Sequence, residues 1–413
     1  MSDRVCDDAS GLLTLDEALR RLLALVDPVR TTNSLPLVEA AGRVLAEDVV
    51  SALDLPAFTN SAMDGYALRS GEGIPGAGLP VVGVSLAGQP FRGDVPEGAC
   101  VRIFTGACLP PECDAVIMQE QTALEGGEVR LNQASPLKSG QNVRHQGEEL
   151  RMGDRLLTAG DRLTPASLGL LAATGCGEVK VWRKPRVGFF STGDELREPG
   201  QTLALGEIHE SNRPVLHALL TGLGMEAVDL GVVRDNRECL RAALLQAESG
   251  VDVLITTGGA SVGEADLVAG MLRELGRVEF WKVAIKPGKP FLFGHLGSMP
   301  VMGLPGNPVS MMVTFQQLVR PALLRMAGQD WTPPLRLRAM LRNRVIRKPG
   351  RLEFLRAVWE CHDGVLGVTA LTAQGSHRLT SMQAANSFIV LPSDCTGAEP
   401  GEWVDIELFG LDP

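Results

Sequence analysis

The chain has 413 residues, of which 45% are hydrophobic and 21% charged, and its formal net charge is −10. A chain of this length exceeds one hydrophobic core, so we expect about two to four domains. The negative charge argues against a broad surface for nucleic acid or an anionic membrane, but it permits a local basic pocket. No apolar run approaches the ~20 residues of a membrane-spanning helix. The N-terminus, MSDRVCDDASG, lacks the pattern of a signal peptide, so a cytoplasmic protein is expected.

The eight cysteines are scattered and include no C-x-x-C pair. The closest two, Cys108 and Cys113, are followed by no histidine at the spacing of a zinc finger. We therefore expect reduced thiols rather than disulfides or a zinc site.

The first helix has a clear start signal. Thr14 and Glu17 have the T-x-x-E spacing of a capping box, and LDEALRRLLALV repeats apolar residues at helical period. Short β-like runs separated by Gly and Pro then fill residues 56–144, which predicts a small β-rich domain. A helix from Thr164 and a strand at 179–182 follow.

From Arg186 onward, predicted strands alternate with predicted helices. The strands are RVGFFS, AVDLGVV, VDVLITTGG, VEFWKVAI and MPVMGL, and the helices are SNRPVLHALLTGLG, NRECLRAALLQAE, ADLVAGMLRELG and PVSMMVTFQQLVRPALLRMAG. Ser211 or Asn212 is the expected N-cap of the first of these helices. This alternation predicts a parallel, doubly wound sheet. After Gln329 a Pro-rich linker leads to ~80 residues with strand and turn signals and no strong helical period, which predicts a small β-barrel or sandwich.

Four strand ends in the α/β region carry Gly-rich or polar turns, at residues 191–195, 256–263, 286–290 and 305–308. Ligands bind outside the carboxyl ends of the strands in open parallel sheets. Glycine lets successive backbone N–H groups face an anion, and the helix after Asn307 adds partial positive charge. One such turn alone is more simply a tight connection, but four at one edge favour phosphate-ester chemistry between Arg186 and Gln329. Neither a Walker loop nor a G-x-G-x-x-G motif at the first strand is present.

Three carboxylates, those of Glu195, Asp235 and Asp266, each follow a predicted strand and can gather at the same edge. Mg²⁺ usually takes one or two carboxylates together with substrate phosphates. For any single residue, a solvated surface charge is an equally good interpretation.

Three lysines, Lys282, Lys286 and Lys289, lie on or beside one predicted strand and could neutralise an anion. Lys282 and Lys286 are four residues apart, so they point to the same side of an extended strand. The mixture of carboxylates and lysines around glycine turns favours metal-assisted phosphate chemistry.

Motifs spread in order over nearly the whole chain point to one family. They are NSAMDGYA, RIFTGA, VIMQEQ, SGQNVRHQGEE, FFSTGDEL, TTGGASVGEAD, KVAIKPGKPFLFG, GLPGNPVS, GRLEFLR and QGSH. In them the chain resembles the molybdopterin molybdenumtransferases, a family related to the C-terminal domain of gephyrin. The resemblance implies molybdate and adenylylated molybdopterin as substrates, Mg²⁺ as cofactor and release of AMP during synthesis of the molybdenum cofactor.

The resemblance also implies a multidomain α/β plus β architecture with four domains. These are an extended domain of residues 1–55 and 146–183, an inserted β-rich domain of residues 56–145, a central doubly wound α/β domain of residues 184–329 and a C-terminal β-barrel of residues 335–413. It further implies a homodimer whose active sites lie between the α/β domain of one subunit and the inserted domain of the other. Molybdopterin adenylyltransferase and the enzymes that receive the cofactor are implied protein partners.

Site residues carry over from the family onto matching positions of this sequence. The resemblance implies catalytic roles for Asp64, Thr105, Glu149, Glu195, Asp235, Asp266, Lys282, Lys286, Arg356 and Ser376. It implies substrate binding by Thr192, Gly193, Asp194, Gly258, Gly259, Ser261, Gly263, Pro287, Lys289, Pro305, Gly306, Asn307, Pro308 and Ser310. Lys286, Ser310, Arg356 and Ser376 resemble the molybdate pocket, and Asp235 and Asp266 the Mg²⁺ ligands. Glu149 departs from the family, which has aspartate there, and its extra methylene changes its reach.

Two other interpretations remain open. The chain could be a non-catalytic, gephyrin-like scaffold that binds molybdopterin, although it keeps the polar residues that a scaffold could lose. It could also resemble the smaller molybdopterin adenylyltransferase, but NSAMDGYA and GRLEFLR lie in modules that the single-domain enzyme lacks.

Overall fold

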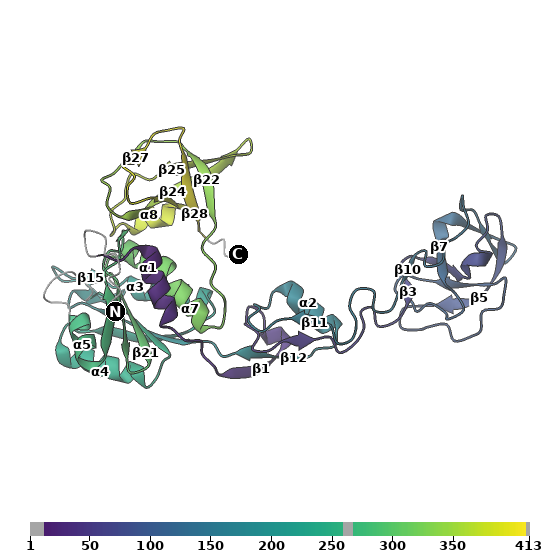
Figure 1. Cartoon of the computed structure of the whole chain (residues 1–413), viewed down its shortest axis with the longest axis horizontal. Helices are drawn as coiled ribbons and strands as arrows, with labels where there is room; N and C mark the ends of the chain where they lie inside the picture. Colours follow the sequence, from purple (N-terminus) through teal and green to yellow (C-terminus); the bar gives the residue numbers. More distant parts are fainter. Residues whose placement is uncertain (1–11, 259–266, 410–413) are drawn as a thin grey trace, which may run out of the picture. The chain divides into compact units, whose positions relative to one another are not determined.

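The computed structural model describes residues 12–258 and 267–409. Contacts divide the chain into two compact units (Figure 1). One unit is Ser34–Val181, and the other combines Met1–Asn33 with Trp182–Pro413. Each unit is described by itself below.

The Ser34–Val181 unit begins and ends with short elements around a small core. Strand β2 (Val49–Val50) pairs antiparallel with β11 (Arg155–Leu157). Helix α2 (Pro165–Ala173) begins as predicted at Thr164, whose side chain accepts a hydrogen bond from the Ser167 N–H while the Ser167 hydroxyl receives one from the Thr164 N–H. This reciprocal pairing satisfies two N–H groups that have no partner within the helix.

The β-rich part of the same unit is a six-stranded sheet in the order β7-β4-β6-β5-β9-β8. Its strands are β4 (Gly65–Leu68), β5 (Gly78–Ser85), β6 (Cys100–Ile103), β7 (Ala115–Met118), β8 (Thr122–Glu125) and β9 (Glu128–Leu131). The short strands β3 (Asn60–Ser61) and β10 (Val143–Arg144) pair beside it. A Cβ at Gly65 would lie 1.8 Å from the Ile117 carbonyl oxygen, so only glycine fits at the start of β4.

The larger unit begins with helix α1 (Leu15–Ala24). The Thr14 side chain accepts from the Glu17 N–H at 3.2 Å, as the T-x-x-E pattern predicts. The Glu17 carboxylate, however, accepts from Arg20 and Arg21, so the structure shows one half of the predicted capping box.

The α/β part holds a six-stranded sheet in the order β16-β13-β17-β21-β20-β18. Its elements in chain order are β13 (Arg186–Thr192), α3 (Asn212–Gly222), β16 (Glu226–Val233), α4 (Arg237–Glu248), β17 (Val253–Thr257), α5 (Leu267–Leu275), β18 (Arg277–Trp281), β20 (Leu292–Leu296) and β21 (Met299–Leu304). The predicted alternation of strands and helices is confirmed, with Ser211 at the N-cap position of α3.

The predicted parallel sheet is confirmed for β16, β13, β17 and β21 but not for β20, a strand that the sequence analysis did not predict. Strands β16, β13, β17 and β21 are parallel, whereas β20 runs antiparallel to both β21 and β18. The reason is the connection, because β20 and β21 are joined by Gly297 and Ser298 alone. A two-residue turn can join only antiparallel strands, and Gly297 adopts a φ of 57° there.

The predicted strand VEFWKVAI is also interrupted. Strand β18 ends at Trp281, Lys282 adopts a φ of 79°, and β19 (Ile285–Lys286) pairs instead with strand β24 of the next domain. The Lys282 N–H donates to the Phe291 carbonyl at 2.9 Å. Lys282 and Lys286 therefore do not share one face of an extended strand.

The last predicted helix of this region contains a π-helical turn. Helix α6 (Pro308–Thr314) leads into the turn η4 (Phe315–Val319) and then into α7 (Arg320–Met326). Pro321 has no N–H for the carbonyl of Gln317, and its ring crowds that carbonyl, which explains the wider turn just before it.

The C-terminal region is a closed five-stranded barrel, which confirms one of the two predicted forms. The strands close in the order β24-β25-β22-β28-β26 and back to β24, with β22 and β25 parallel. They are β22 (Arg336–Leu341), β24 (Leu352–His362), β25 (Val365–Ala370), β26 (Ser387–Leu391) and β28 (Trp403–Leu408). A short helix that the sequence did not predict, α8 (Leu379–Ala384), precedes β26.

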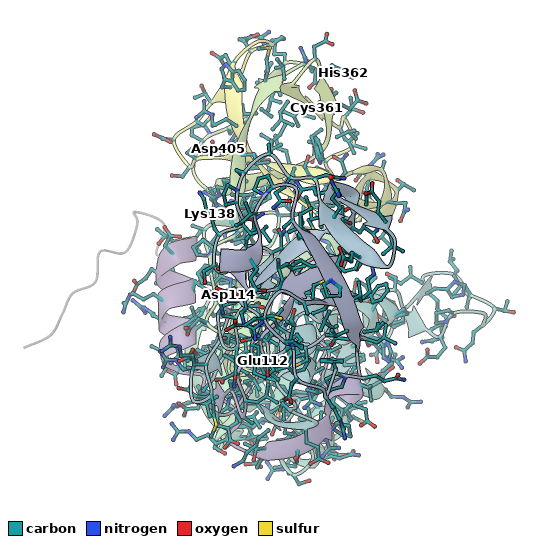
Figure 2. All side chains as sticks on the ribbon, turned by 90° about the vertical axis from the view of Figure 1, so that its right-hand side faces the viewer. Glu112, Asp114, Lys138, Cys361, His362 and Asp405 are labelled. Atoms are coloured by element: carbon teal, nitrogen blue, oxygen red, sulfur yellow. The ribbon has the colours of Figure 1, made fainter. Side chains whose placement is uncertain are left out.

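Cysteines in the described part of the chain are all free, as expected. Burial raises the pKa of the Cys100 and Cys113 thiols to about 12, so both are protonated. Cys361 is exposed beside His362 at the end of β24 (Figure 2).

Candidate active site

The carboxyl ends of β13, β16 and β17 bring several predicted site residues together. Thr192, the last residue of β13, donates its hydroxyl to the Asp235 carboxylate just beyond β16. The Asp194 carboxylate accepts from the Asp235 N–H at 3.3 Å. Gly258 follows β17 with a φ of 81°, and a Cβ there would lie 2.3 Å from the Thr192 carbonyl oxygen. The two turns therefore touch through their backbones, and this contact requires glycine.

Four predicted residues, Gly259, Ser261, Gly263 and Asp266, lie outside the described residues. Among residues 12–258 and 267–409 no group of three or more His, Cys, Asp or Glu side chains could hold a metal ion. Asp235 is thus the one predicted Mg²⁺ ligand that the described part contains, and oxygen donors are the ligands Mg²⁺ prefers.

A cavity of about 410 Å³ lies where the β19 turn, the start of α6 and the barrel meet. The predicted residues that line it are Lys286, Pro287, Lys289, Asn307, Ser310 and Ser376. Its wall is closed by a backbone hydrogen bond of 3.1 Å from the Val309 N–H to the Ser376 carbonyl. This bond holds a loop of the barrel against the N-terminus of α6, where backbone N–H groups favour an anion.

Arg356 on β24 is fully buried and does not itself line this cavity, although its neighbour Leu355 does. Its Nη2 donates to the carbonyls of Ala373 and Gly375 at 3.0 and 3.2 Å, and Gly375 itself lines the cavity. Its Nε and Nη1 have no partner among the described residues. Burial lowers the pKa of the guanidinium because the low-dielectric surroundings disfavour its charge. An oxyanion within reach would relieve this cost.

Lys286 is tied to a carboxylate that the sequence analysis did not single out. Its ammonium lies 2.8 Å from Glu353, which is 4% exposed and also 3.1 Å from Arg347. The alternating charges of RLEFLR were visible in the sequence, but that pattern is as typical of an exposed edge strand as of a binding site. Only the pairing of β19 with β24 brings Glu353 to Lys286.

Four other residues predicted in the α/β region are not among those that line this cavity: Lys282, Pro305, Gly306 and Pro308. The Lys282 ammonium sits 4.6 Å from the centre of the Trp281 ring. Gly306, next to Pro305, accepts a hydrogen bond from the Asn212 side chain, and Pro308 is the first residue of α6.

Asp64, Thr105 and Glu149 belong to the Ser34–Val181 unit. The Asp64 carboxylate accepts from both the N–H and the hydroxyl of Thr105 at 2.8 Å. These hydrogen bonds, with the charge of Arg102, hold the pKa of Asp64 below its ordinary value. Glu149 is exposed, and its N–H donates to the Leu55 carbonyl.

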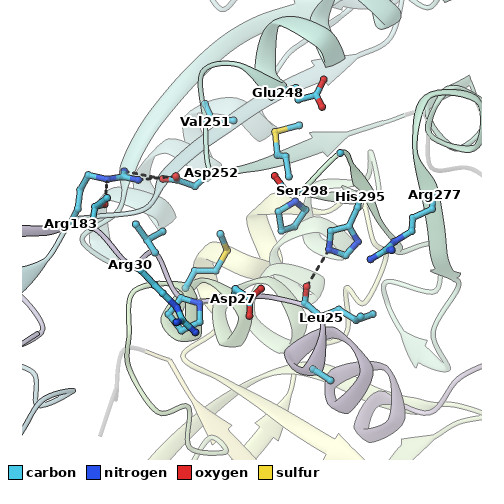
Figure 3. A pocket seen from close by; sticks show the side chains of 18 residues that line it. Leu25, Asp27, Arg30, Arg183, Glu248, Val251, Asp252, Arg277, His295 and Ser298 are labelled. Atoms are coloured by element: carbon cyan, nitrogen blue, oxygen red, sulfur yellow. Dashed lines mark hydrogen bonds and ion pairs between the residues drawn. The ribbon is translucent and has the colours of Figure 1, made fainter.

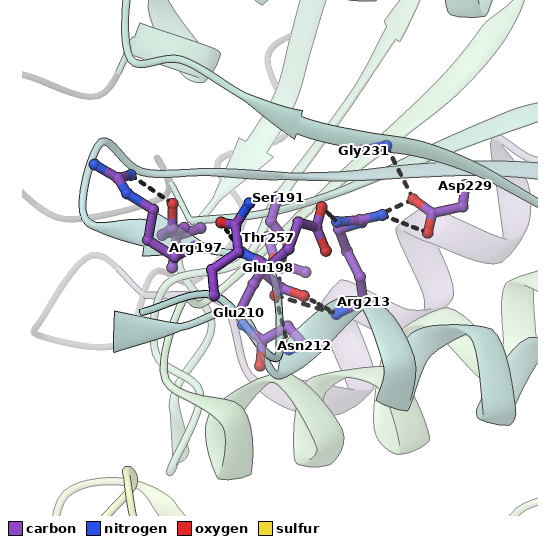
Figure 4. Close-up of polar contacts among 11 residues, drawn as sticks. Ser191, Arg197, Glu198, Glu210, Asn212, Arg213, Asp229, Gly231 and Thr257 are labelled. Carbon is purple, nitrogen blue, oxygen red and sulfur yellow. Dashed lines mark hydrogen bonds and ion pairs between the residues drawn. The ribbon is translucent and has the colours of Figure 1, made fainter. Parts of the chain in front are cut away.

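A buried polar network at the start of α3 was also missed (Figure 4). Glu210, 2% exposed, accepts from Ser191 at the end of β13 and from the first N–H groups of α3. A glutamate directly before a predicted helix start was the available signal, because carboxylates are common at helix N-termini.

A second cavity of about 630 Å³ lies at the amino ends of β13 and β17 (Figure 3). Arg183 and Asp252 form a bidentate ion pair in its wall, and the His295 ring is 3.1 Å from the Leu25 carbonyl. The contact between His295 and Leu25 joins the N-terminal segment to the sheet, while His295 Nδ1 has no hydrogen-bond partner among the described residues.

The fold and the site together define a multidomain protein with an α/β domain, a β-barrel and a cavity between them that lysine and serine side chains line. Three family descriptions match successive parts of the chain. Residues 13–175 match the MoeA N-terminal region (domain I and II), residues 188–325 a probable molybdopterin binding domain, and residues 338–409 the MoeA C-terminal region (domain IV).

Relatives match over nearly the whole length. Molybdopterin molybdenumtransferase of Haemophilus influenzae is 44% identical over 96% of this chain and 99% of its own. The Bacillus subtilis protein of the same name is 33% identical over 96% and 94%. Gephyrin of Dictyostelium discoideum is 32% identical, over 97% of this chain and 62% of its own. The chain belongs to the molybdopterin molybdenumtransferase family.

Solved structures agree with this assignment. A molybdopterin biosynthesis MoeA protein from Pyrococcus horikoshii superposes with a TM-score of 0.83 at 31% identity, covering 96% of this chain and all of its own. In the described part of the chain, no helix has the length and apolar character needed to cross a membrane.

Proposed function

We propose that the protein transfers molybdenum from molybdate to adenylylated molybdopterin and releases AMP, giving the molybdenum cofactor. Family membership supports this class of reaction, because the relatives carry the name molybdopterin molybdenumtransferase. This reaction requires one site for an oxyanion and a separate site for a phosphorylated ligand.

The observation that carries the proposal is the fully buried Arg356 with two guanidinium nitrogens that have no partner among the described residues. A buried cation is unfavourable unless it is paired or hydrogen-bonded. Molybdate, as a substrate with oxygen acceptors, would satisfy Nε and Nη1 by reaching them past Gly375, which lines the neighbouring cavity and accepts from Nη2. Lys286, Ser310 and Ser376 line that cavity and offer one further cation and two hydroxyl donors.

The turns after β13, β16 and β17 are the proposed place for the phosphate groups and Mg²⁺. Asp235 would hold the ion together with substrate phosphate oxygens, and Asp266 is the second proposed ligand. When bound, Mg²⁺ would neutralise charge that develops at the phosphoanhydride. The described side chains keep Asp235 in place, since Thr192 donates to its carboxylate and Asp194 accepts from its N–H.

Asp64 and Thr105 would complete the site from a second copy of the chain, as a homodimer with shared sites requires. Their mutual hydrogen bonds fix a charged carboxylate on the Ser34–Val181 unit. A cytoplasmic location, a molybdopterin adenylyltransferase that supplies the substrate and apo-enzymes that accept the product belong to the same proposal.

The test is synthesis of an active cofactor. Purified protein, adenylylated molybdopterin, Mg²⁺ and molybdate are mixed, and the product is offered to a molybdenum-free apo-enzyme. We expect activation that requires all four components. Binding of the substrate without formation of active cofactor, under conditions in which the Haemophilus influenzae relative succeeds, would favour the scaffold interpretation.

A further inference from the structure

Glu210 is a buried carboxylate that joins helix α3 to the sheet (Figure 4). Its Oε1 accepts from the Ser191 hydroxyl at 2.9 Å and from the Asn212 N–H at 2.8 Å. Its Oε2 accepts from the Arg213 N–H at 2.9 Å. The partial positive charge at the N-terminus of α3 compensates the carboxylate, and the Arg213 guanidinium binds Glu198 and Asp229 instead.

The hydroxyl groups next to Glu210 form a chain with one possible direction. Ser191 and Thr257 are register neighbours on β13 and β17, and their hydroxyl oxygens are 2.8 Å apart. Since Ser191 donates its only hydroxyl proton to the carboxylate, its oxygen must accept from Thr257. The charge of Glu210 thus orients Thr257, the residue directly before the Gly258 turn.

Asn212 extends the same connection to a third strand. It is 7% exposed, and its side-chain nitrogen donates to the Gly306 carbonyl at 2.8 Å, in the turn between β21 and α6. A Cβ on Gly306 would lie 3.5 Å from the Gly258 Cα, so these two turns lie side by side. The first turn of α3 therefore contacts β13 at Ser191 and the turn after β21 at Gly306, and it reaches the Gly258 turn through these two residues.

A helix cap alone does not require these contacts. A side chain at the N-cap usually accepts from the helix N–H groups, yet Ser211 makes no such bond and Glu210 replaces it. The bonds to Ser191 and Gly306 add nothing to the capping of α3. They fix the distance between the helix and the strand ends.

We propose that Glu210 and Asn212 form a brace, defined by these two side chains, that positions the Gly258 and Gly306 turns for the phosphate groups of the substrate. The two are positioning residues, because they act through the turns. The role in substrate binding rests on the proposed function, whereas the mechanical role does not. Loss of the brace loosens the turns, whereas the Lys286–Glu353 pair and the hydrogen bonds of Arg356 do not involve the brace and stay in place.

The experiment compares Glu210→Gln and Ser191→Ala with the wild-type full-length protein. Ser191→Ala removes the link to the sheet while leaving the cap of α3 in place, so it stays informative if Glu210→Gln folds poorly. The matched control is Asp252→Asn at the opposite end of β17. Asp252 also accepts a backbone N–H, that of Arg186 at 2.6 Å, but it lies among the residues of the second cavity.

Hydrogen exchange of the ligand-free protein gives the first readout. We expect the amides of 256–258 to exchange about tenfold faster in both variants, and those of 306–307 to do so in Glu210→Gln, with no change in Asp252→Asn. Equal exchange in Ser191→Ala and the wild type would overturn the brace. This arm is valid even if the wild-type protein releases no AMP, an outcome that would count against the proposed function alone.

AMP release gives the second readout. We expect the KM for adenylylated molybdopterin to rise about tenfold in Ser191→Ala, with kcat changed less than twofold and the dependence on molybdate unchanged. An unchanged KM alongside faster exchange would overturn the positioning role. A comparable rise in Asp252→Asn would also overturn it, because the effect would then report general destabilisation.

Discussion

The Lys286 ammonium lies 2.8 Å from Glu353 Oε1, and this ion pair links β19 at the cavity wall to β24 of the barrel. The two side chains differ in exposure, at 50% for Lys286 and 4% for Glu353. Glu353 also meets the buried Arg347 at 3.1 Å. Lys286 is therefore held at the cavity wall by a carboxylate that is itself fixed.

This difference in exposure predicts unequal effects on stability. Glu353→Gln leaves the buried Arg347 without its charged partner and should lower the free energy of unfolding by about 3 kcal/mol. Lys286→Ala removes a half-exposed partner and should cost less than about 1 kcal/mol. Chemical denaturation of both full-length variants measures the difference, and equal losses would contradict it.

Gly258 offers a test of the backbone contact between two strand-end turns. Gly258→Ala adds a Cβ at a φ of 81°, 2.3 Å from the Thr192 carbonyl oxygen, so substrate binding should fall together with stability. Gly224→Ala is the control, because its φ of 76° causes similar strain but no atom lies within 4 Å. The control should cost about 1–2 kcal/mol in unfolding free energy and leave binding unchanged. Equal binding by the two variants would show that the contact is unimportant.

The Asp64–Thr105 contact predicts a pH dependence. The pKa of Asp64 is below its ordinary value, first because of the Thr105 N–H and then because of the Thr105 hydroxyl. The contact therefore stabilises the fold above the ordinary carboxyl range, and this contribution is lost as pH falls through the lowered pKa. Thr105→Ala should raise the pKa of Asp64 only part of the way to its ordinary value, since the N–H of residue 105 still donates. Thr105→Ser keeps the hydroxyl and should leave the pKa of Asp64 unchanged. Carboxyl NMR titration decides, and identical titration curves for Thr105→Ala and the wild type would refute this assignment.

Helix α2 should depend on its cap. Thr164→Ala removes the acceptor of the Ser167 N–H, 3.1 Å away, and should destabilise the helix by about 1 kcal/mol. Thr164→Ser keeps the oxygen and should cost little. Native-state hydrogen exchange of residues 166–173 reports the loss. Unchanged exchange in Thr164→Ala would show that the cap contributes nothing.

Elements with strong periodicity were predictable from the sequence. The α3 and α4 helices and the strands β13, β16 and β17 follow from apolar pattern and cap residues alone. Strand β20 was not predicted at all, and its direction depends on the two-residue turn that joins it to β21. The break at Lys282 depends on a left-handed residue that no pattern indicates.

The sequence indicated the candidate site residues that lie on Gly-rich or charged turns. It did not indicate the residues that hold those side chains in position. Glu353 and Glu210 are buried carboxylates whose partners lie 67 and 19 residues away in Lys286 and Ser191. Only the pairing of strands brings such groups together. The sequence could therefore identify Lys286 but not the residue that holds it.

The most direct test of the central claim is AMP release from adenylylated molybdopterin as the molybdate concentration is raised, for the wild type and for Lys286→Ala. We predict saturable, molybdate-dependent release by the wild type. The Lys286→Ala variant, once shown to be folded, should need an about tenfold or higher molybdate concentration for half-maximal AMP release, because the cavity has lost one cation. Tight substrate binding with no AMP release at any molybdate concentration, in an assay where the Haemophilus influenzae relative is active, would contradict the account.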